Sequence, residues 1–330
     1  MDVVSEFLKR GILLSPELRD KIKPEEIEKI ASRFDKKKVV LTPEEYKLLK
    51  GEVKILMEYK KGPEVKRISN FIDFYNRRFE FLRNLLREKL PDATSINKLN
   101  AGNVTSIGMV RELTSEGFLL EDQTGSVLCI SHEKVLEDDV VGVKGIYKGG
   151  KLHVEKIIYP DIPLQREIGL TEDECYVYFT CNFVKKPERA LHVFAFNVSQ
   201  PPNDCWLVTK KTGLPKSQRK VYVNLPSLVE VNGVKIFMFE SDFSDLKRKL
   251  GEDDEKKLIL SLLRRRHLLP NVYMEGDPYL LREIPDIIFL RGNEDFFLNY
   301  KGVSVISVSG DRGFLVNLKT REYEYEGDNL

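Results

Sequence analysis

The chain has 330 residues, more than a single compact core usually contains, so its length predicts two or three domains. Hydrophobic residues make up 42% and charged residues 32%, with 53 Lys and Arg against 52 Asp and Glu, which excludes a disordered composition and demands neither a nucleic-acid nor a membrane partner. The start of the chain lacks the basic and apolar regions of a signal peptide, and no apolar run reaches the roughly 18 residues of a membrane span. We therefore expect a cytoplasmic protein.

The cysteines and histidines argue against a common metal site. The four cysteines form no C-x-x-C pair, so a zinc knuckle is not expected and reduced, buried thiols are. Four histidines in 330 residues is a low count for a protein that would use imidazole ligands.

The first part of the chain is predicted to be helical. Residues 1–48 read as a small N-terminal helical domain, in which Thr42 and Glu45 form a capping box. Residues 49–93 contain a short strand, Val53–Tyr59, and then a long amphipathic helix from Ile68 to about Leu90, ended by Pro91. Its apolar positions, among them Phe71 and Ile72, are expected to face inward. We interpret the arginines between them as a solvated face, with phosphate contact as the alternative: Arg77, Arg78, Arg83 and Arg87.

Residues 94–163 change to a period of two, with glycine-rich turns. Five short strands over about 65 residues predict a small barrel of the OB-fold type. One turn is expected at 122–125, with Gly125 at positive φ, and another at Gly149 and Gly150. Such barrels bind single strands through aromatic and basic residues. The candidate nucleic-acid contacts, against ordinary barrel packing, are Lys144, Tyr147, Lys148 and Lys151.

Residues 167–330 follow a linker rich in proline, and they consist of short apolar runs separated by loops. Such runs are typical of strands buried on both faces, so we expect a strand-rich α/β sandwich. One helix is predicted from Asp253 to about Leu268. The run Arg264–His267 at its end is interpreted as cations that complement the helix dipole and form local ion pairs, with phosphate contact by the three arginines as the alternative.

Three stretches of this sequence resemble one protein family. They are "ISNFIDFYNRRFEFLRNLLREKL", "YPDIPLQR" and "LLRRRHLLP", the last followed by "EGDPYLLREIPDIIFL" and "KGVSVISVSG". Their order over about 270 residues resembles the small subunit of archaeal family D DNA polymerase, which is related to the B-subunits of eukaryotic replicative polymerases. The resemblance implies a last domain of the calcineurin-like phosphoesterase type, in which many members hold two metal ions with His, Asp and Asn side chains.

The positions that correspond to the family's metal ligands carry other residues here. The Asp-x-His motif is replaced by Cys181 and Phe183, and the bridging Asp by Asn197. Lys210 and Lys211 stand in place of the Gly-Asn-His-Asp loop, and Glu240 in place of a histidine. The final Gly-His-x-His turn reads Gly292, Asn293 and Glu294, in the stretch "LRGNEDFF". Phenylalanine and lysine cannot replace these ligands, so we predict a sandwich of the metallophosphoesterase type without metal, cofactor or catalytic residues.

One alternative keeps a metal. Several acids from separate loops could form an all-oxygen site for Mg²⁺ or Mn²⁺, although the bridging acid of a two-metal site is missing. The chain's four histidines are not at ligand positions in the resemblance. The acids of this alternative are Glu240, Asp242, Asp245, Glu294 and Asp295.

The sequence thus favours a non-catalytic accessory subunit that forms a heterodimer with the large catalytic subunit of a family D DNA polymerase and acts in DNA replication near the nucleoid. Two other functions stay open. One is a metal-dependent 3′–5′ exonuclease or phosphoesterase with a rebuilt carboxylate site, and the other is a stand-alone single-stranded DNA-binding protein. The end of the sequence, "REYEYEGDNL", has no clear motif for a sliding clamp and leaves that contact open.

Overall fold

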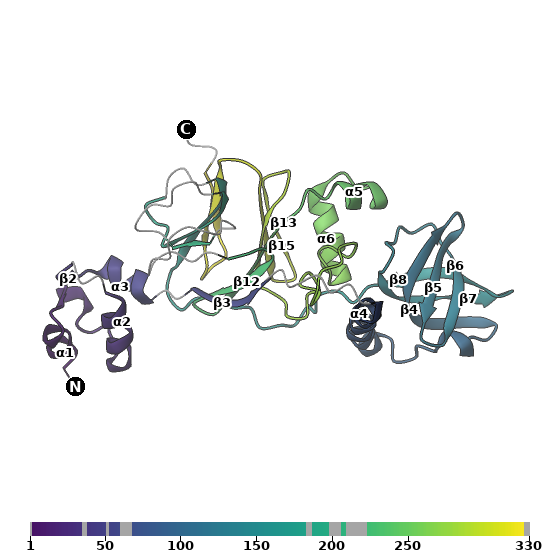
Figure 1. Cartoon of the computed structure of the whole chain (residues 1–330), viewed down its shortest axis with the longest axis horizontal. Coiled ribbons are helices and arrows are strands. Elements are labelled where there is room, and N and C mark those ends of the chain that lie inside the picture. The colour runs from purple at the N-terminus through teal and green to yellow at the C-terminus, as the bar shows by residue number, and fades with distance from the viewer. Residues whose placement is uncertain are drawn as a thin grey trace.

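The computed structural model describes residues 2–34, 38–50, 53–59, 68–182, 187–197, 206–208 and 223–326. It is a mixed α/β and β protein with several sheets and few helices, as the sequence predicts. Figure 1 shows a helical part at the N-terminal end, two facing sheets in the middle and a β-barrel at the opposite end. Within the described ranges, no helix is long and apolar enough to cross a membrane.

The N-terminal part packs short elements around one small core. Phe7, Leu18, Ile30 and Leu41 are almost fully buried in it. The predicted capping box is confirmed, because the Glu45 amide donates to Thr42 Oγ1 and the Thr42 amide donates to Glu45 Oε2, both at 3.3 Å. The elements are α1 (Val3–Lys9), α2 (Ile27–Arg33), α3 (Pro43–Lys50), the parallel strands β1 (Leu13–Leu14) and β2 (Val40–Leu41), and the short 3₁₀ helices Pro16–Leu18 and Pro24–Glu26.

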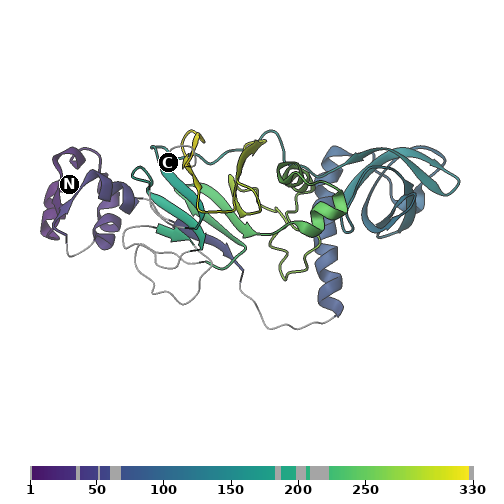
Figure 2. The same cartoon turned by 90° about the horizontal axis from the view of Figure 1, so that it is seen from above.

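The predicted strand and long helix are both present, as β3 (Val53–Glu58) and α4 (Ile68–Lys89). The C-terminal half of α4 buries Leu82 and Leu86 in a cluster that also contains barrel residues. Phe71 and Ile72 do not face inward as predicted, since they are 49% and 54% exposed. The reason is positional: the N-terminal half of α4 extends beyond the barrel (Figure 2).

The barrel is closed and has five strands in the order β4-β5-β6-β8-β7. Its neighbours are antiparallel except for β6 and β8. Gly149 and Gly150 turn the chain between β7 and β8 at φ values of 59° and 77°, as predicted. The other turn differs, because Gly125 is not at positive φ and the Asp122 carboxylate instead accepts the amides of Thr124 and Gly125. The strands are β4 (Gly102–Thr114), β5 (Gly117–Asp122), β6 (Gly125–Ile130), β7 (Val140–Lys148) and β8 (Lys151–Ile158).

Two sheets face each other across a shared core that contains Phe179, Phe194 and Phe289. One sheet has the order β11-β10-β9-β17-β18, and the other has β15-β16-β14-β13-β12-β3. The first sheet consists of β9 (Tyr176–Asn182), β10 (His192–Asn197), β11 (Trp206–Val208), β17 (Gly313–Asn317) and β18 (Tyr323–Tyr325). The second adds to β3 the strands β12 (Ser227–Val231), β13 (Val234–Glu240), β14 (Ile287–Arg291), β15 (Phe296–Tyr300) and β16 (Val303–Val308).

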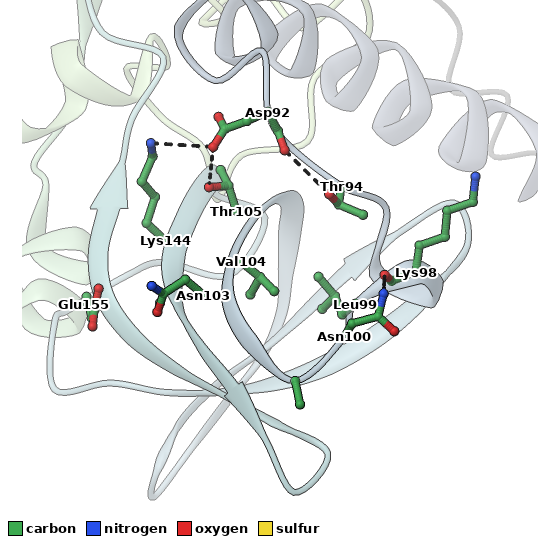
Figure 3. A pocket seen from close by; sticks show the side chains of 12 residues that line it. Asp92, Thr94, Lys98, Leu99, Asn100, Asn103, Val104, Thr105, Lys144 and Glu155 are labelled. Carbon is green, nitrogen blue, oxygen red and sulfur yellow. Dashed lines mark hydrogen bonds and ion pairs between the residues drawn. The ribbon is translucent and has the colours of Figure 1, made fainter.

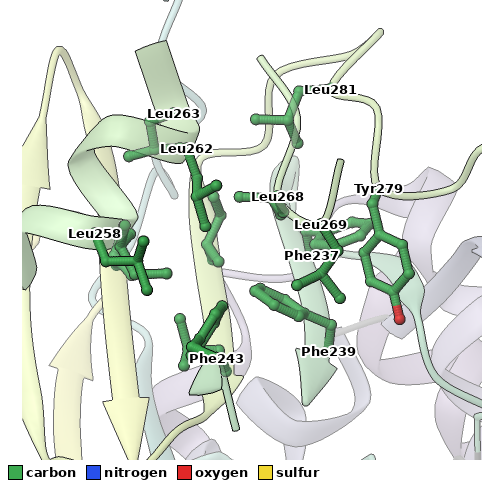
Figure 4. Close-up of a cluster of buried hydrophobic side chains, with 14 of the residues drawn as sticks. Phe237, Phe239, Phe243, Leu258, Leu262, Leu263, Leu268, Leu269, Tyr279 and Leu281 are labelled. Carbon is green, nitrogen blue, oxygen red and sulfur yellow. The ribbon is translucent and has the colours of Figure 1, made fainter. Parts of the chain in front are cut away.

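Two helices cover the outer face of the six-stranded sheet. They are α5 (Ser244–Leu250) and α6 (Glu255–Arg265), and Figure 4 shows Leu258 and Leu262 of α6 in the cluster that contains Phe237 and Phe239 of β13. The helix predicted to reach Leu268 ends three residues earlier, because Arg266 adopts a left-handed conformation with φ 57°.

Candidate functional site

The parallel strands of both sheets end at the same side of the two-sheet domain. Strands β9 and β10 are parallel in one sheet, and β13, β14 and β16 are parallel in the other. Burial raises the pKa of the Cys181 thiol near the end of β9, and its charged neighbours come from both sheets and their loops: Arg291, Asp295, Asp311 and Glu240. The carboxyl ends of parallel strands are where α/β proteins commonly place ligands, so this end is the candidate site.

The positions singled out by the resemblance are partly brought together here. Cys181 is fully buried in the core between the sheets. Asn197 ends β10 opposite Asn182, and Glu240 ends β13 opposite Arg291. Phe183, Lys210 and Lys211 lie outside the described residues. The end of β13 therefore carries an acidic residue, Glu240, and the neighbouring end of β14 carries a basic residue, Arg291.

The loop that begins at Gly292 is held by Glu255, the first residue of α6. A Cβ on Gly292 would lie 2.0 Å from Glu255 Oε1, so the loop approaches this carboxylate closely. The Asn293 amide donates to both Glu255 oxygens, at 3.2 and 3.3 Å, and Lys247 forms an ion pair with Glu255 at 3.1 Å. Glu255 is fully buried, whereas Glu294 is exposed. The sequence did not indicate Glu255 as a site residue, because nothing in its neighbours along the chain shows that it is buried.

Asp295 closes the same loop through three hydrogen bonds. Its Oδ1 accepts from the Ser309 amide at 2.6 Å and from Ser309 Oγ at 2.8 Å, and its Oδ2 accepts from the Tyr325 hydroxyl at 2.8 Å. These partners belong to the segment after β16 and to strand β18. The carboxylate therefore fastens three chain segments to one another.

The other acids of the predicted all-oxygen site are spread over the start of α5. Asp242 accepts from the Ser244 amide and hydroxyl, both at 3.2 Å. Asp245 pairs with Arg248 at 2.6 Å and with Lys249 at 3.2 Å, and these contacts lower its pKa. Within the part of the chain that the structure describes, no three His, Cys, Asp or Glu side chains form a group that could hold a metal ion.

The barrel carries a groove of about 500 Å³, shown in Figure 3. Of the four predicted nucleic-acid contacts, only Lys144 lines it, and its ammonium group lies 3.9 Å from Asp92. Lys151 instead pairs with Glu116 at 2.7 Å, Tyr147 packs against the barrel core, and Lys148 is exposed at the end of β7. The sequence did not indicate the other groove residues: Asp92, Thr94, Lys98, Leu99, Asn100, Ala101, Asn103, Val104, Thr105, Gly145 and Glu155.

This groove is electrically balanced. Its lining has two lysines, Lys98 and Lys144, and two acids, Asp92 and Glu155. Nucleic-acid grooves carry an excess of positive charge because they must follow a phosphate backbone. The balance therefore favours a polar, uncharged contact here over phosphate binding.

The junction between the barrel and the two-sheet domain corrects two sequence interpretations. Arg265 does not form the local ion pair predicted at the helix end, because it is 5% exposed and its Nε lies 3.0 Å from both oxygens of Asp139 in the barrel segment. Arg266 is also buried and donates to the Leu281 carbonyl. The sequence could not show this, because Asp139 lies 126 residues from Arg265 along the chain.

Arg78 of α4 is likewise not on a solvated face, since it is 1% exposed. Its Nε and Nη2 donate to the two oxygens of Asp277 at 2.8 and 3.0 Å, and its Nη1 donates to the Pro270 carbonyl at 2.9 Å. His267 Nε2 lies 2.9 Å from Asp277 Oδ1. Burial alone would raise the pKa of Asp277, but hydrogen bonds from His267 and Arg78 lower it to about 2. Burial lowers the pKa of His267 to about 4, so the imidazole is neutral at pH 7.

Comparison with known proteins gives two related chains. The DNA polymerase II small subunit of Archaeoglobus fulgidus is 31% identical over 125 residues, which cover 34% of this chain and 25% of that protein. The DNA polymerase II small subunit of Methanothermobacter thermautotrophicus is 32% identical over 119 residues, which cover 30% of this chain and 25% of that protein. The matched part thus spans a quarter of each relative. The predicted resemblance to the archaeal family D small subunit is confirmed over about a third of the chain.

No protein-family profile matches the chain. Among solved structures, a solution NMR structure of a Thermotoga maritima protein aligns with 46% of this chain and 97% of its own, at 10% identity and a TM-score of 0.24. A score this low carries no argument about a shared fold.

Proposed function

We propose that this chain is a non-catalytic accessory subunit of a family D DNA polymerase, and that it forms a heterodimer with the large catalytic subunit in the cytoplasm, near the nucleoid. The two related proteins support this assignment, because both are named as DNA polymerase II small subunits. The observation that favours a non-catalytic role is the hydrogen bonding of Asp295 and Glu255 at the carboxyl end of the two-sheet domain. Carboxylates occupied by loop amides and hydroxyls support structure rather than chemistry.

We interpret the closed five-stranded barrel as an OB-fold and the two-sheet domain as one of the metallophosphoesterase type with altered ligand positions. The barrel's strand count and closure support the first assignment. The second is supported by parallel strands in both sheets whose ends carry Cys181 and Glu240, two of the altered positions. A fold can persist after its chemistry is lost, because the core holds the fold and the ligands do not.

Co-purification tests the assembly. The tagged full chain is isolated from its host, and its partners are identified by mass spectrometry. We expect the large catalytic subunit of a DNA polymerase in a near-equal amount. A chain that reaches its native abundance and carries no polymerase subunit would contradict the proposal.

A nuclease assay tests the absence of activity. The full chain is incubated with Mn²⁺ and 3′-labelled single-stranded DNA, and we expect no metal-dependent cleavage. Two variants are compared with the native chain: Glu240→Ala at a strand end, and Glu275→Gln, an exposed acid outside the predicted carboxylate site, as the control. Cleavage that Glu240→Ala abolishes and Glu275→Gln retains would establish the alternative exonuclease with a rebuilt carboxylate site.

The balanced charge of the barrel groove does not favour the second candidate function, that of a stand-alone single-stranded DNA-binding protein, and a binding assay tests it. Fluorescence anisotropy of a labelled oligonucleotide at several salt concentrations separates the two functions, with Lys98→Ala and Lys144→Ala as test variants and Lys156→Ala, exposed on β8, as the control. Binding by the chain alone with a steep salt slope, lost in the test variants, favours the second function. Binding that requires the large subunit favours the first.

A further inference from the structure

Two arginines meet at the end of the two-sheet domain opposite the candidate site. Arg166 comes from the linker after the barrel, and Arg321 comes from the turn between β17 and β18. Gly169 joins them, because its amide donates to Asp286 Oδ1 at 2.9 Å and its carbonyl accepts from Arg321 Nη2. Arg166 Nη2 donates to the same Asp286 oxygen at 3.3 Å and to the Gly302 carbonyl at 2.8 Å. The two guanidinium groups thus share one small region.

This region has more positive than negative charge. Asp286 is the carboxylate next to both arginines, and it also accepts two amides, from Gly169 and from Lys235 at 3.0 Å. The lysines beside it have their own partners: Lys235 pairs with Glu283, and Lys301 pairs with Asp161 at 2.5 Å. The Asp286 carboxylate is therefore the negative charge beside two guanidinium groups, those of Arg166 and Arg321, and the region keeps one positive charge in excess.

Three guanidinium nitrogens there are buried and have no acceptor among the residues that the structure describes. They are Arg166 Nε, Arg321 Nε and Arg321 Nη1. The Arg166 side chain is only 10% exposed. Buried donors are almost always satisfied, and a charged donor without an acceptor is especially unfavourable, so these nitrogens indicate a missing acceptor.

The backbone of Arg321 supports the same reading. Arg321 has a φ of 66°, in the left-handed region that a long side chain rarely adopts, and its amide donates to the Asn317 carbonyl at 2.8 Å. The tight turn directs the guanidinium toward Gly169. Burial lowers the pKa of Arg321 to about 10, Asp286 opposes this lowering and Arg166 adds to it. An added negative charge would stabilise the charged form of both arginines.

We propose that Arg166 and Arg321 form a binding site for a phosphate-type oxyanion. Guanidinium groups bind phosphate oxygens through paired N–H donors, and the three buried nitrogens without an acceptor belong to these two side chains. Two sources present this chemistry, namely free phosphate and the terminal phosphate of a DNA strand. The proposal goes beyond the proposed docking role, and the site lies at the opposite end of the strands from the altered ligand positions.

The test measures binding of inorganic phosphate to the full chain by isothermal titration calorimetry, together with thermal stability in phosphate and in chloride at equal ionic strength. We expect one phosphate per chain and a higher melting temperature in phosphate. Arg321→Gln and Arg166→Gln should each weaken binding at least about tenfold, as expected when a charged donor pair is lost. Arg321→Lys should weaken phosphate binding as well, because lysine keeps the positive charge but lacks the paired N–H donors of the planar guanidinium group. Lys319→Gln, an exposed lysine of the same turn, should change it less than about twofold.

Circular dichroism confirms that each variant is folded before its binding is interpreted. Equal melting temperatures in phosphate and chloride would overturn the site, and so would phosphate binding that Arg321→Gln and Lys319→Gln reduce equally, since this means an adventitious ion only. Competition by 5′-phosphorylated against unphosphorylated oligonucleotides then identifies the source. Displacement of phosphate by the phosphorylated strand alone assigns the site to a DNA end, and the absence of displacement assigns it to the free anion.

Discussion

The junction between barrel and two-sheet domain and the carboxyl end of the two-sheet domain both gather charged residues, but they use them differently. At the junction, buried cations pair with carboxylates from distant parts of the chain, as Arg265 does with Asp139 and Arg78 with Asp277. At the carboxyl end, Asp295 and Glu255 accept mainly from amides and hydroxyls of nearby loops. Charge fixes the relative position of two domains in the first region and the shape of loops in the second.

The largest expected effect is at the junction. Asp277→Ala leaves both Arg78 and His267 buried without their acceptor, so we expect the free energy of unfolding to fall by about 3–5 kcal/mol. Urea denaturation followed by circular dichroism measures it. The control is Glu275→Ala, an exposed acid in the same loop, with an expected change within about 0.5 kcal/mol. Similar losses in both variants would mean that the buried network does not hold the junction.

The pH dependence of stability sharpens this comparison. The pKa of His267 is about 4 in the folded chain against 6.5 in the unfolded one, so the unfolded chain binds the extra proton first as the pH falls. Stability should therefore decrease between about pH 6.5 and pH 4, by up to roughly 3 kcal/mol from this group. His267→Asn should flatten that part of the curve, whereas His132→Asn, at an exposed position, should not. An unchanged slope in His267→Asn would contradict the buried neutral imidazole.

Asp277 contributes at lower pH and in the same direction as His267, because its pKa is also lower in the folded chain than in the unfolded one. Its folded pKa of about 2 lies below the unfolded value, so its contribution is present above about pH 4 and is lost as the pH falls toward 2. The two groups thus act in adjacent pH windows, and a curve recorded from pH 7 to 2 separates them.

A smaller effect is expected at the carboxyl end. Asp295→Asn weakens hydrogen bonds from Ser309 and Tyr325, and we expect it to lower the free energy of unfolding by about 1.5–3 kcal/mol. Glu294→Gln, in the same loop and exposed, should cost less than about 0.5 kcal/mol. Mn²⁺ titration should give the same result for both variants and the native chain. A loss of Mn²⁺ binding in Asp295→Asn would show that Asp295 is a metal ligand and that its role is not limited to holding the loop.

The smallest effect belongs to the barrel surface. Lys151 and Glu116 form an exposed ion pair at 2.7 Å, so Lys151→Ala should leave the midpoint of urea unfolding almost unchanged. The same measurement in 1 M NaCl should remove even that difference, because salt screens exposed pairs. A large, salt-resistant loss would show that exposed and buried pairs do not differ here as proposed.

Local patterns in the sequence predicted local structure well. The spacing of apolar residues and Pro91 predicted α4 almost to the residue, and Thr42 with Glu45 predicted a helix start. The same spacing placed Phe71 inward wrongly, because a periodic stripe does not show how far along a helix its partner extends. Turn residues behaved similarly: the Gly149–Gly150 turn was predicted correctly, while an Asp122 side chain shapes the turn at Gly125.

The sequence was less informative about which charges are buried. Arg78 and Arg77 are neighbours on one helix, yet Arg78 is buried and Arg77 is exposed, and only the position of Asp277, 199 residues from Arg78, distinguishes them. Glu255 was missed for the same reason, since its partners are a loop amide and a lysine brought near by folding. Long-range contacts decide these cases, and no periodicity in a single sequence reveals them.

Strand β3 has a consequence for how the chain is assembled. It precedes the barrel in sequence but forms the edge of the six-stranded sheet beside β12. Since β12 follows the barrel in sequence, β3 and β12 can pair only after the whole barrel has been synthesised. During synthesis β3 must therefore wait for its partner, and the folded barrel shortens the gap that the intervening residues would otherwise have to close. A fragment that starts at residue 167 would lack this strand and would leave the edge of β12 open to pairing with another chain.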